Sequence, residues 1–324
     1  MDRLALIQTP IASELELFKT LFNDSLVTEN DLLNNAVAHI RRKEGKMMRP
    51  MLLFLSAKLF GEVSSETYHT AVSLELLHTA SLVHDDVVDE SVERRGQLSV
   101  NAMYNNKVAV LVGDYMLASS LLQVSRTGNS PIIETIAALG QSLSDGELLQ
   151  LSNIRNPHFS EAVYLDVIAK KTAVLFAACA ATGAMSVYAA DHEVALARRL
   201  GELIGICFQI RDDIFDYFDK QDIGKPTGND MTEGKLTLPA IYVLNKTGDA
   251  AACAIAQKVK NGTAVPDEIA RLIAFTKENG GIEYATEVML RYKAEALQLL
   301  EPLPDSEAKA ALKVYLDYLI EREK

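Results

Sequence analysis

The chain has 324 residues, of which 48% are hydrophobic and 23% are charged, and its 17 Gly and 9 Pro exclude a collagen-like or low-complexity protein. The 44 acidic residues outnumber the 32 basic ones, and the net charge of −12 argues against a nucleic-acid partner. The 3 cysteines lie among apolar residues without metal-ligand spacing, which is typical of buried cysteines in a reducing compartment.

Apolar residues recur at intervals of three and four along most of the chain, whereas alternating strand patterns are scarce. We therefore predict an all-α fold, with one domain over residues 1–324. The N-terminus lacks the basic flank and apolar block of a signal peptide, so we expect a cytoplasmic protein. Gly, Pro and polar clusters predict helix breaks at Gly45–Pro50, Gly61–Ser65, Thr127–Pro131, Asn153–Ser160, Asp222–Gly234, Asn261–Pro266, Glu278–Gly281 and Pro302–Ser306.

One uncharged stretch, Thr172–Ala190, approaches the length of a membrane span. Its composition is mostly Ala with Thr, Ser, Gly and Cys, whereas a lipid-facing helix is richer in Leu, Ile and Phe. We therefore expect a helix buried in the protein and no transmembrane segment.

Two predicted helices carry the same acidic spacing, D-D-x-x-D, at 85–89 and at 212–216. The first and last aspartates of each motif are four residues apart and so share one helix face. A single motif of this kind could decorate an exposed helix end, but two copies on mainly apolar helices favour carboxylates that line a cavity.

Hard oxygen ligands suit Mg²⁺, which typically bridges a few carboxylates to phosphate oxygens. A diphosphate is therefore the expected ligand, and up to three Mg²⁺ would not balance the charge of six aspartates and a diphosphate. Cations of the protein should lie nearby, and the candidates are Arg94, Arg95, Lys171, Lys225 and Lys235.

These motifs belong to an ordered set that resembles the trans-isoprenyl diphosphate synthases, in particular their long-chain octaprenyl or heptaprenyl type. The set spans Gly45 to Pro239. Besides the two aspartate motifs it comprises Gly45-Lys46-x-x-Arg49-Pro50, His78, Arg94-Arg95-Gly96, Gly113-Asp114, Gly146-Glu147-x-x-Gln150, Lys171-Thr172-Ala173, Phe208-Gln209, Gly224-Lys225, Asp230 and Gly234-Lys235-x-Thr237-x-Pro239.

The resemblance implies a bundle of mostly antiparallel helices around a central cavity, a homodimer, and condensation of isopentenyl diphosphate with an allylic diphosphate. It implies Mg²⁺ ligation by Asp85, Asp89 and Asp212, with Asp86, Asp213 and Asp216 in support. It assigns allylic-diphosphate contacts to Arg94, Lys171, Thr172, Gln209, Lys225 and Lys235, and an isopentenyl-diphosphate pocket to Gly45, Lys46, Arg49, His78 and Arg95. Taken alone, Lys46 and Arg49 could be surface cations, and His78 a core histidine.

Product length is predicted from the residues before Asp85. A lipid tail held by its diphosphate there would run back along the helix past Ser81 and Ala80, then Leu77 and Leu74. Short-chain members of the resembled family tend to have aromatic residues at the first two positions, so small ones imply a product of about C30 to C50, which suits a quinone side chain. Small residues could instead serve only close helix packing.

Four alternative functions are to be weighed against the sequence. A terpene cyclase or a head-to-head synthase would need no isopentenyl site, which Lys46, Arg49 and Arg95 argue against. A non-catalytic subunit of a heteromeric synthase would lose ligands that are intact here. A shorter-chain geranylgeranyl or farnesyl diphosphate synthase would share every motif except the small residues. The lipid product could bring any of the synthases to a membrane surface.

Overall fold

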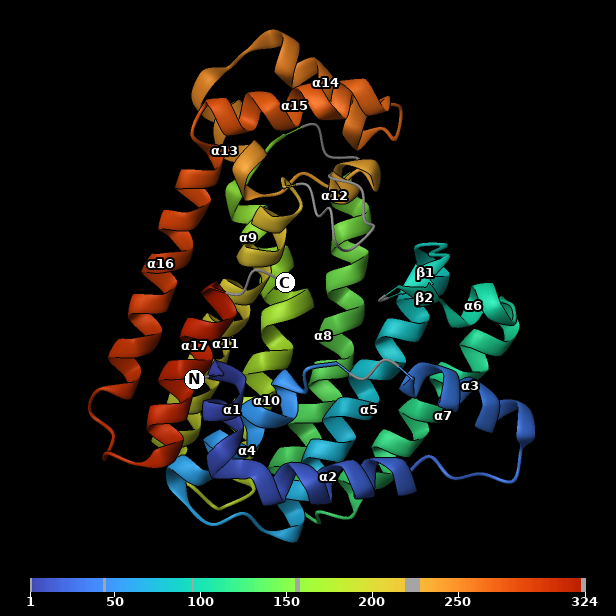
Figure 1. The fold of residues 1–324 in the computed structure, drawn as a ribbon, viewed down its shortest axis with the longest axis vertical. Helices are drawn as coiled ribbons and strands as arrows, with labels where there is room; N and C mark the ends of the chain where they lie inside the picture. The colour runs from blue at the N-terminus through green and yellow to red at the C-terminus, as the bar shows by residue number, and fades with distance from the viewer. Residues whose placement is uncertain (1, 43–44, 95, 155–157, 219–227, 322–324) are drawn as a thin grey trace. The chain divides into compact units, whose positions relative to one another are not determined.

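The computed structural model describes residues 2–42, 45–94, 96–154, 158–218 and 228–321. Within these residues the regular structure is helical apart from one pair of short strands, which confirms the all-α prediction (Figure 1). The chain forms two compact units: unit 1 contains Met1–Gly140, Phe176–Gly201 and Leu303–Tyr318, and unit 2 contains Gln141–Leu175, Glu202–Pro302 and Leu319–Lys324. A single domain over residues 1–324 stays a prediction.

Unit 1 is built on long helices. Its N-terminal part consists of α1 (Arg3–Gln8), the 3-10 turn η1 (Thr9–Ile11), α2 (Ala12–Asp24), α3 (Asp31–Arg41), α4 (Met48–Phe60), α5 (Ser65–Val88), β1 (Glu93–Arg94), β2 (Gln97–Leu98), α6 (Val100–Met103) and α7 (Asn106–Ser125). Four of the five unit boundaries fall within helices, namely α8 (Ser130–Ile154), α10 (Val174–Met185), α11 (Asp191–Phe215) and α17 (Glu307–Glu321), and the fifth lies between Pro302 and Leu303.

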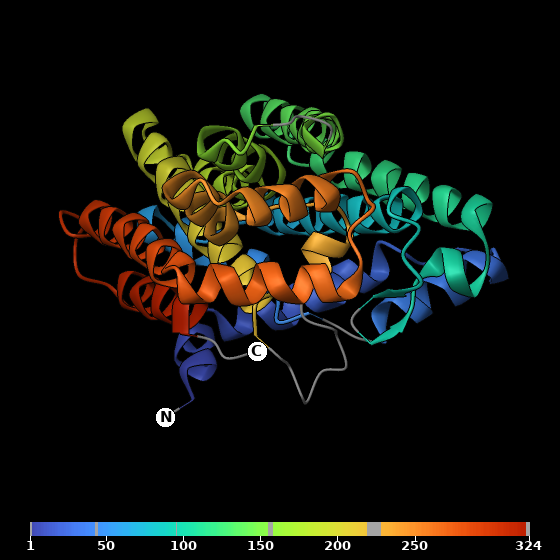
Figure 2. The same ribbon diagram turned by 90° about the horizontal axis from the view of Figure 1, so that it is seen from above.

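Helices α5 and α7 lie side by side and run in opposite directions (Figures 1 and 2). Ser73 Oγ donates to the Ser120 carbonyl at 2.9 Å, and Ser120 Oγ donates to the Ser73 carbonyl at 2.8 Å. One turn away His69 Nδ1 contacts Gln123 Oε1 at 2.9 Å. These reciprocal contacts between small buried side chains let the two backbones approach closely and fix the register of α5, which carries the first aspartate motif.

Helix α5 ends within that motif, at Val88, and Asp89 is its C-cap. Glu90, two residues beyond its last helical residue, has a φ of 51°, which is in the left-handed region and cannot continue the helix. The chain then forms the antiparallel pair β1 and β2, in which Arg94 faces Gln97, and Gly96 supplies the turn with a φ of 72°. The sequence pattern had indicated no strand here.

The stretch Thr172–Ala190 contains α10, whose residues 175–184 are buried as predicted, whereas Tyr188, beyond the end of α10, is 75% exposed. Its Cys179 is fully buried, and burial raises the pKa of that thiol to about 12. Cys207 is also buried, whereas Cys253 is only half-buried, which departs from the expectation for all three. Among the described residues, α7 is the one helix whose length and mean hydropathy of 1.5 would allow it to cross a membrane.

Unit 2 adds the short helices α9 (Glu161–Ile168) and α12 (Asn229–Thr232), the π-helical turn η2 (Ala169–Ala173), and α13 (Leu238–Thr247), α14 (Ala250–Lys260), α15 (Pro266–Glu278) and α16 (Gly281–Leu300). Two apolar cores hold it together. One packs Tyr164 and Ile168 of α9 against Ile210 and Ile214 of α11, and the other surrounds Tyr217 at the end of α11.

Candidate active site

The first aspartate motif occupies the last turn of α5. The Asp89 amide donates to the Asp85 carbonyl at 2.8 Å, so the motif is helical, and Asp85 and Asp89 are one turn apart on the same face. Asp85 is half-buried and Asp89 is exposed, whereas Asp86 is 2% exposed. Carboxylates at the carboxyl end of a helix are unfavourable next to its negative dipole end, so this arrangement favours a cation.

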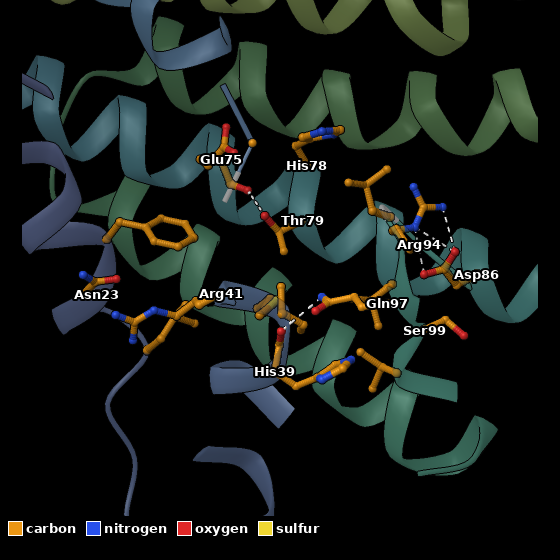
Figure 3. A pocket seen from close by; sticks show the side chains of 18 of the residues that line it. Asn23, His39, Arg41, Glu75, His78, Thr79, Asp86, Arg94, Gln97 and Ser99 are labelled. Carbon is orange, nitrogen blue, oxygen red and sulfur yellow. Dashed lines mark hydrogen bonds and ion pairs between the residues drawn. The ribbon is translucent and has the colours of Figure 1, made fainter. Parts of the chain in front are cut away.

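Asp86 is held by Arg94 of β1. Arg94 Nε lies 2.8 Å from both carboxylate oxygens of Asp86, and Nη2 lies 2.7 Å from Oδ1 (Figure 3). The Asp86 carbonyl also accepts from the Ser91 amide at 2.9 Å and from Asn101 Nδ2 at 3.2 Å. Asp86 therefore ties the strand pair to α5, and a diphosphate contact by Arg94 stays a prediction.

We expect Arg94→Ala to lower the free energy of unfolding by about 1–3 kcal/mol, because it leaves the buried Asp86 carboxylate without its main partner. Urea denaturation of the ligand-free protein measures the loss. The double variant Asp86→Asn with Arg94→Ala is the control, and it should lose less than the sum of the two single variants. Unfolding of Arg94→Ala at the wild-type urea concentration would contradict this assignment.

A pocket of unit 1, here called the unit 1 pocket, opens beside this ion pair (Figure 3). Its apolar walls include Phe18, Phe22 and Leu82, and its lining also contains four residues named from the sequence: Gly45, His78, Asp86 and Arg94. Its further polar lining residues are Lys19, Asn23, His39, Arg41, Glu75, Thr79, Gln97 and Ser99, which carry no motif in the sequence.

Three of the residues predicted to bind isopentenyl diphosphate, Gly45, Lys46 and Arg49, lie at or just before the start of α4. Met47, its N-cap, has a φ of 53°, an uncommon conformation for a residue with a side chain and one that is often found at functional sites. Arg49 lies with its guanidinium 5.3 Å from the centre of the Phe176 ring, and its buried Nε has no hydrogen-bond partner among the described residues. An unsatisfied buried donor of this kind is suited to an anionic ligand.

The other members of this group differ in their exposure. Lys46 is exposed, with its ammonium 5.3 Å from the centre of the Tyr318 ring, and His78 is buried at 7% exposure. Arg95 lies outside the described residues. The structure therefore brings Gly45 and His78 to one pocket and leaves the roles of Lys46 and Arg95 as predictions.

The predicted chain-length residues are packed inside unit 1. Leu74, Leu77 and Ala80 are buried, and Ser81 is half-buried, with its Oγ donating to the His78 carbonyl at 2.9 Å. The unit 1 pocket is instead lined by the neighbouring face of α5, which includes Glu75, Thr79 and Leu82. A lipid passage along Leu74, Leu77, Ala80 and Ser81 stays a prediction.

In the second aspartate motif, at the end of α11, Asp213 is the buried member. Its carboxylate accepts from Tyr164 Oη at 2.5 Å and from Gln209 Nε2 at 2.8 Å. Burial raises the pKa of Asp213 to about 7 although both hydrogen bonds oppose this, and the charges of Asp212 and Asp216 raise it further. Burial also raises the pKa of Tyr164 well above its ordinary value, with Asp213 adding to the effect.

Asp216 has a different task, because it fixes the start of α12. Its Oδ1 accepts from the Asn229 amide at 3.0 Å and its Oδ2 accepts from the Asp230 amide at 3.1 Å. Asp230 is thereby held near the acidic motif, and its burial and the charge of Asp213 raise the pKa of Asp230 well above the ordinary value. Asp216 therefore supports the site through the backbone of α12.

Lys171 and Thr172 lie on the π-helical turn η2, a type of turn that occurs often at functional sites. The Lys171 ammonium pairs with Glu147 and lies 3.3 Å from Gln150 Oε1, while Thr172 Oγ1 donates to Gln209 Oε1 at 2.7 Å. A Cβ at Gly146 would lie 3.1 Å from the Lys171 amide nitrogen, so the Gly146 of the sequence motif permits this close approach.

These side chains meet in a second pocket, here called the unit 2 pocket. Lys171, Thr172, Gln209 and Lys235, which are the predicted diphosphate contacts of unit 2 within the described residues, all line it, together with Asp213. Lys235 pairs with Glu233 at 2.6 Å. Lys225 lies outside the described residues. The polar lining residues that the predicted site omitted are Gln150, His158, Ser160, Tyr164, Asp230, Thr237 and Lys260, and of these Gln150, Asp230 and Thr237 stand in the quoted motifs.

The donor chemistry fits Mg²⁺. Within the part of the chain that the structure describes, no three His, Cys, Asp or Glu side chains converge on a ready-made metal cage. Asp85 and Asp89 offer two carboxylates one helical turn apart, and Mg²⁺ is usually bound by one or two carboxylates with waters and substrate phosphates completing its shell. These residues therefore fit a metal that arrives with its diphosphate.

Comparison with known proteins agrees with this geometry. The profile of the family described as Polyprenyl synthetase matches residues 30–275. The chain is 33% identical to the all-trans-nonaprenyl-diphosphate synthase (geranyl-diphosphate specific) of Rhodobacter capsulatus, over 94% of each chain. It is 58% identical to a geranylgeranyl pyrophosphate synthase structure from Bacteroides thetaiotaomicron, over 99% of this chain and 100% of that one, with a TM-score of 0.89.

A polyprenyl synthase structure from Caulobacter crescentus, crystallised with calcium and isoprenyl diphosphate, is 27% identical over 99% of this chain and 98% of that one. Its TM-score of 0.93 shows the same fold.

Proposed function

The chain belongs to the polyprenyl synthetase family of prenyltransferases, and from this premise we propose that it is a long-chain all-trans polyprenyl diphosphate synthase. It would condense isopentenyl diphosphate head to tail onto an allylic diphosphate in a cytoplasmic, Mg²⁺-dependent reaction. The observation that carries the proposal is the unit 2 pocket, where the predicted diphosphate contacts Lys171, Thr172, Gln209 and Lys235 lie together.

The chain's own residues suit each step of this reaction. Asp85, Asp89 and Asp212 would hold up to three Mg²⁺, which supply Lewis-acid stabilisation of the departing diphosphate. Lys171, Lys225 and Lys235 would donate charge-assisted hydrogen bonds to the allylic diphosphate as its C–O bond breaks. Lys46, Arg49 and His78 hold isopentenyl diphosphate so that its double bond forms the new C–C bond.

One proton must then leave the isopentenyl unit. No His or Glu of the motifs is required as the base for this step, because the released diphosphate can accept the proton. The protein's contribution to this step is to retain that diphosphate on its lysines and to exclude water from the cation.

Incubation of the purified chain with labelled isopentenyl diphosphate, an allylic primer and Mg²⁺ tests the proposal. We expect labelled prenyl diphosphates that EDTA abolishes. Lack of incorporation would favour a terpene cyclase, and incorporation only after addition of a second protein would favour a subunit of a heteromeric synthase.

The length of the product separates two candidate functions. Ala80 and Ser81 favour a product of about C30 to C50, for example for a quinone side chain, whereas the 58% identical relative is named a geranylgeranyl pyrophosphate synthase. Reversed-phase chromatography of the dephosphorylated products decides between them. A C20 product would identify the shorter-chain enzyme and overturn the long-chain proposal.

We also propose that two copies of the chain associate through α7. Its face opposite α5 exposes Val110, Leu111, Leu117, Leu121 and Leu122, and Leu111 alone is 67% exposed. These positions are separated by 7 residues (110 and 117), 4 residues (117 and 121) and 11 residues (111 and 122), so they share one helix face and form an apolar stripe that a symmetric copy of the chain could cover.

We expect Leu121→Asp to weaken the dimer at least about a hundredfold, because the twofold axis places the buried charge in the interface twice. Sedimentation velocity of a dilution series measures the monomer fraction. Leu290→Asp, at a 46% exposed leucine of α16, is the matched control and should leave the dimer unchanged. A dimer of wild-type affinity in Leu121→Asp would place the interface elsewhere.

A further inference from the structure

Lys260, the last residue of α14, is a buried cation that the motifs do not include. It is 6% exposed and lines the unit 2 pocket together with Lys171, Lys235 and Gln209. Its ammonium lies 3.4 Å from the His158 carbonyl oxygen and 5.8 Å from the centre of the Phe159 ring. The side chain thus reaches from the end of α14 to the wall of the pocket.

The partners of Lys260 are weak compared with those of the other pocket lysines. Lys171 pairs with Glu147 and Lys235 pairs with Glu233, whereas no ion pair involves Lys260 within the described part of the chain. One long hydrogen bond to a carbonyl and a distant ring do not replace the water that a buried ammonium loses. Burial accordingly lowers the pKa of Lys260.

A ligand can supply the missing anion. The unit 2 pocket already contains the carboxyl groups of Asp213 and Asp230, so a bound diphosphate needs compensating cations there. The charges of Lys171 and Lys235 are each partly neutralised by an ion pair with a neighbouring glutamate. Lys260 offers its charge to the pocket without a competing carboxylate among the described residues.

We propose that Lys260 binds the diphosphate that occupies the unit 2 pocket, as a contact additional to those of the sequence motifs. This inference rests on the proposed function, because that function supplies the diphosphate, either as the allylic substrate or as the released inorganic product. Lys260 then closes the side of the pocket formed by His158 and Phe159.

The same helix provides a matched control. Lys258 precedes Lys260 by two residues, is 52% exposed and pairs with Glu268. The variants Lys258→Met and Lys260→Met remove the same charge from α14, and only Lys260 lines the pocket. Lys260→Gln also removes the charge but keeps a donor for the His158 carbonyl, and Lys260→Arg keeps the charge.

Calorimetric titration with inorganic diphosphate and Mg²⁺ measures binding, and steady-state kinetics gives KM for each substrate. We expect Lys260→Met and Lys260→Gln to bind diphosphate at least about tenfold more weakly, since a charge-assisted hydrogen bond is lost. The KM for the allylic diphosphate should rise by a similar factor while the KM for isopentenyl diphosphate stays the same. Lys260→Arg and Lys258→Met should remain within about threefold of the wild type.

Two outcomes separate this inference from the proposed function. If the wild-type chain neither binds diphosphate nor incorporates isopentenyl units, the proposed function fails. If the wild type does both and Lys260→Gln equals it, Lys260 does not contact the ligand. Should Lys260→Met fail to fold, the folded Lys260→Gln variant decides, and an equal rise of both KM values in that variant would show a merely structural role.

Discussion

Replacing Asp85 or Asp212 by alanine lowers turnover at least about a hundredfold in the synthase proposed here, while the protein stays folded. Each substitution removes a predicted Mg²⁺ ligand from a site whose catalysis is mainly electrostatic. The unfolding temperature of metal-free Asp85→Ala should stay close to that of the wild type, because Asp85 is only half-buried and a carboxylate near the carboxyl end of a helix lies next to the negative end of the helix dipole.

Turnover at saturating substrate over a range of Mg²⁺ concentrations measures this effect, and circular dichroism on heating checks the fold. Glu93→Ala, at an exposed carboxylate of β1, is the control and should keep its activity. Near-normal Mg²⁺-dependent activity of Asp85→Ala would refute the assigned metal ligand.

Replacing Ala80 by tyrosine should shorten the product. We expect chains of about C15–C20 in place of chains of about C30–C50. The new ring would block the predicted passage along α5 one turn before Asp85, while the aspartates predicted to bind Mg²⁺ remain in place. Because Ala80 is 2% exposed, the larger side chain should also cost about 1–3 kcal/mol of stability by overpacking.

Thr79→Tyr is the informative comparison, because Thr79 lines the unit 1 pocket on the neighbouring face of α5. Chromatography of the products from both variants shows which face the lipid follows. Wild-type products from Ala80→Tyr together with short products from Thr79→Tyr would move the lipid passage to the unit 1 pocket.

The periodicity of apolar residues sufficed to predict the all-α fold. The two D-D-x-x-D motifs led to the prediction of a site for Mg²⁺ and a diphosphate. Helix breaks such as Thr127–Pro131 and Glu278–Gly281 were identified from sequence because glycine readily adopts the positive φ that ends a helix, as at Gly128 and Gly280. Residues 219–227 of the predicted break Asp222–Gly234 lie outside the described residues. The break at Ser25–Asn30 was not identified, because it contains neither Gly nor Pro, and α3 starts there through the Asn30 side chain, which accepts from the Leu33 amide at 3.1 Å. A polar cap of this kind looks like any other surface residue in a sequence.

Site residues were predictable from sequence where they belong to a motif. They were not predictable where only the fold places them next to the site. Tyr164 meets Asp213 across 49 positions of the chain, and Lys260 reaches the His158 carbonyl across 102. Within the first motif the spacing separates Asp86 from Asp85 and Asp89. It does not show the partner of Asp86, which is buried against Arg94.

The contacts of Asp216 bear on what a substitution at this position would change. Besides its two carboxylate contacts, its carbonyl accepts from the Gly228 amide at 2.9 Å, so one residue fastens the start of α12 to the end of α11. Substitution of Asp216 would therefore alter the position of Asp230 as well as the charge of the second aspartate motif, so its effect would exceed that of one lost carboxylate.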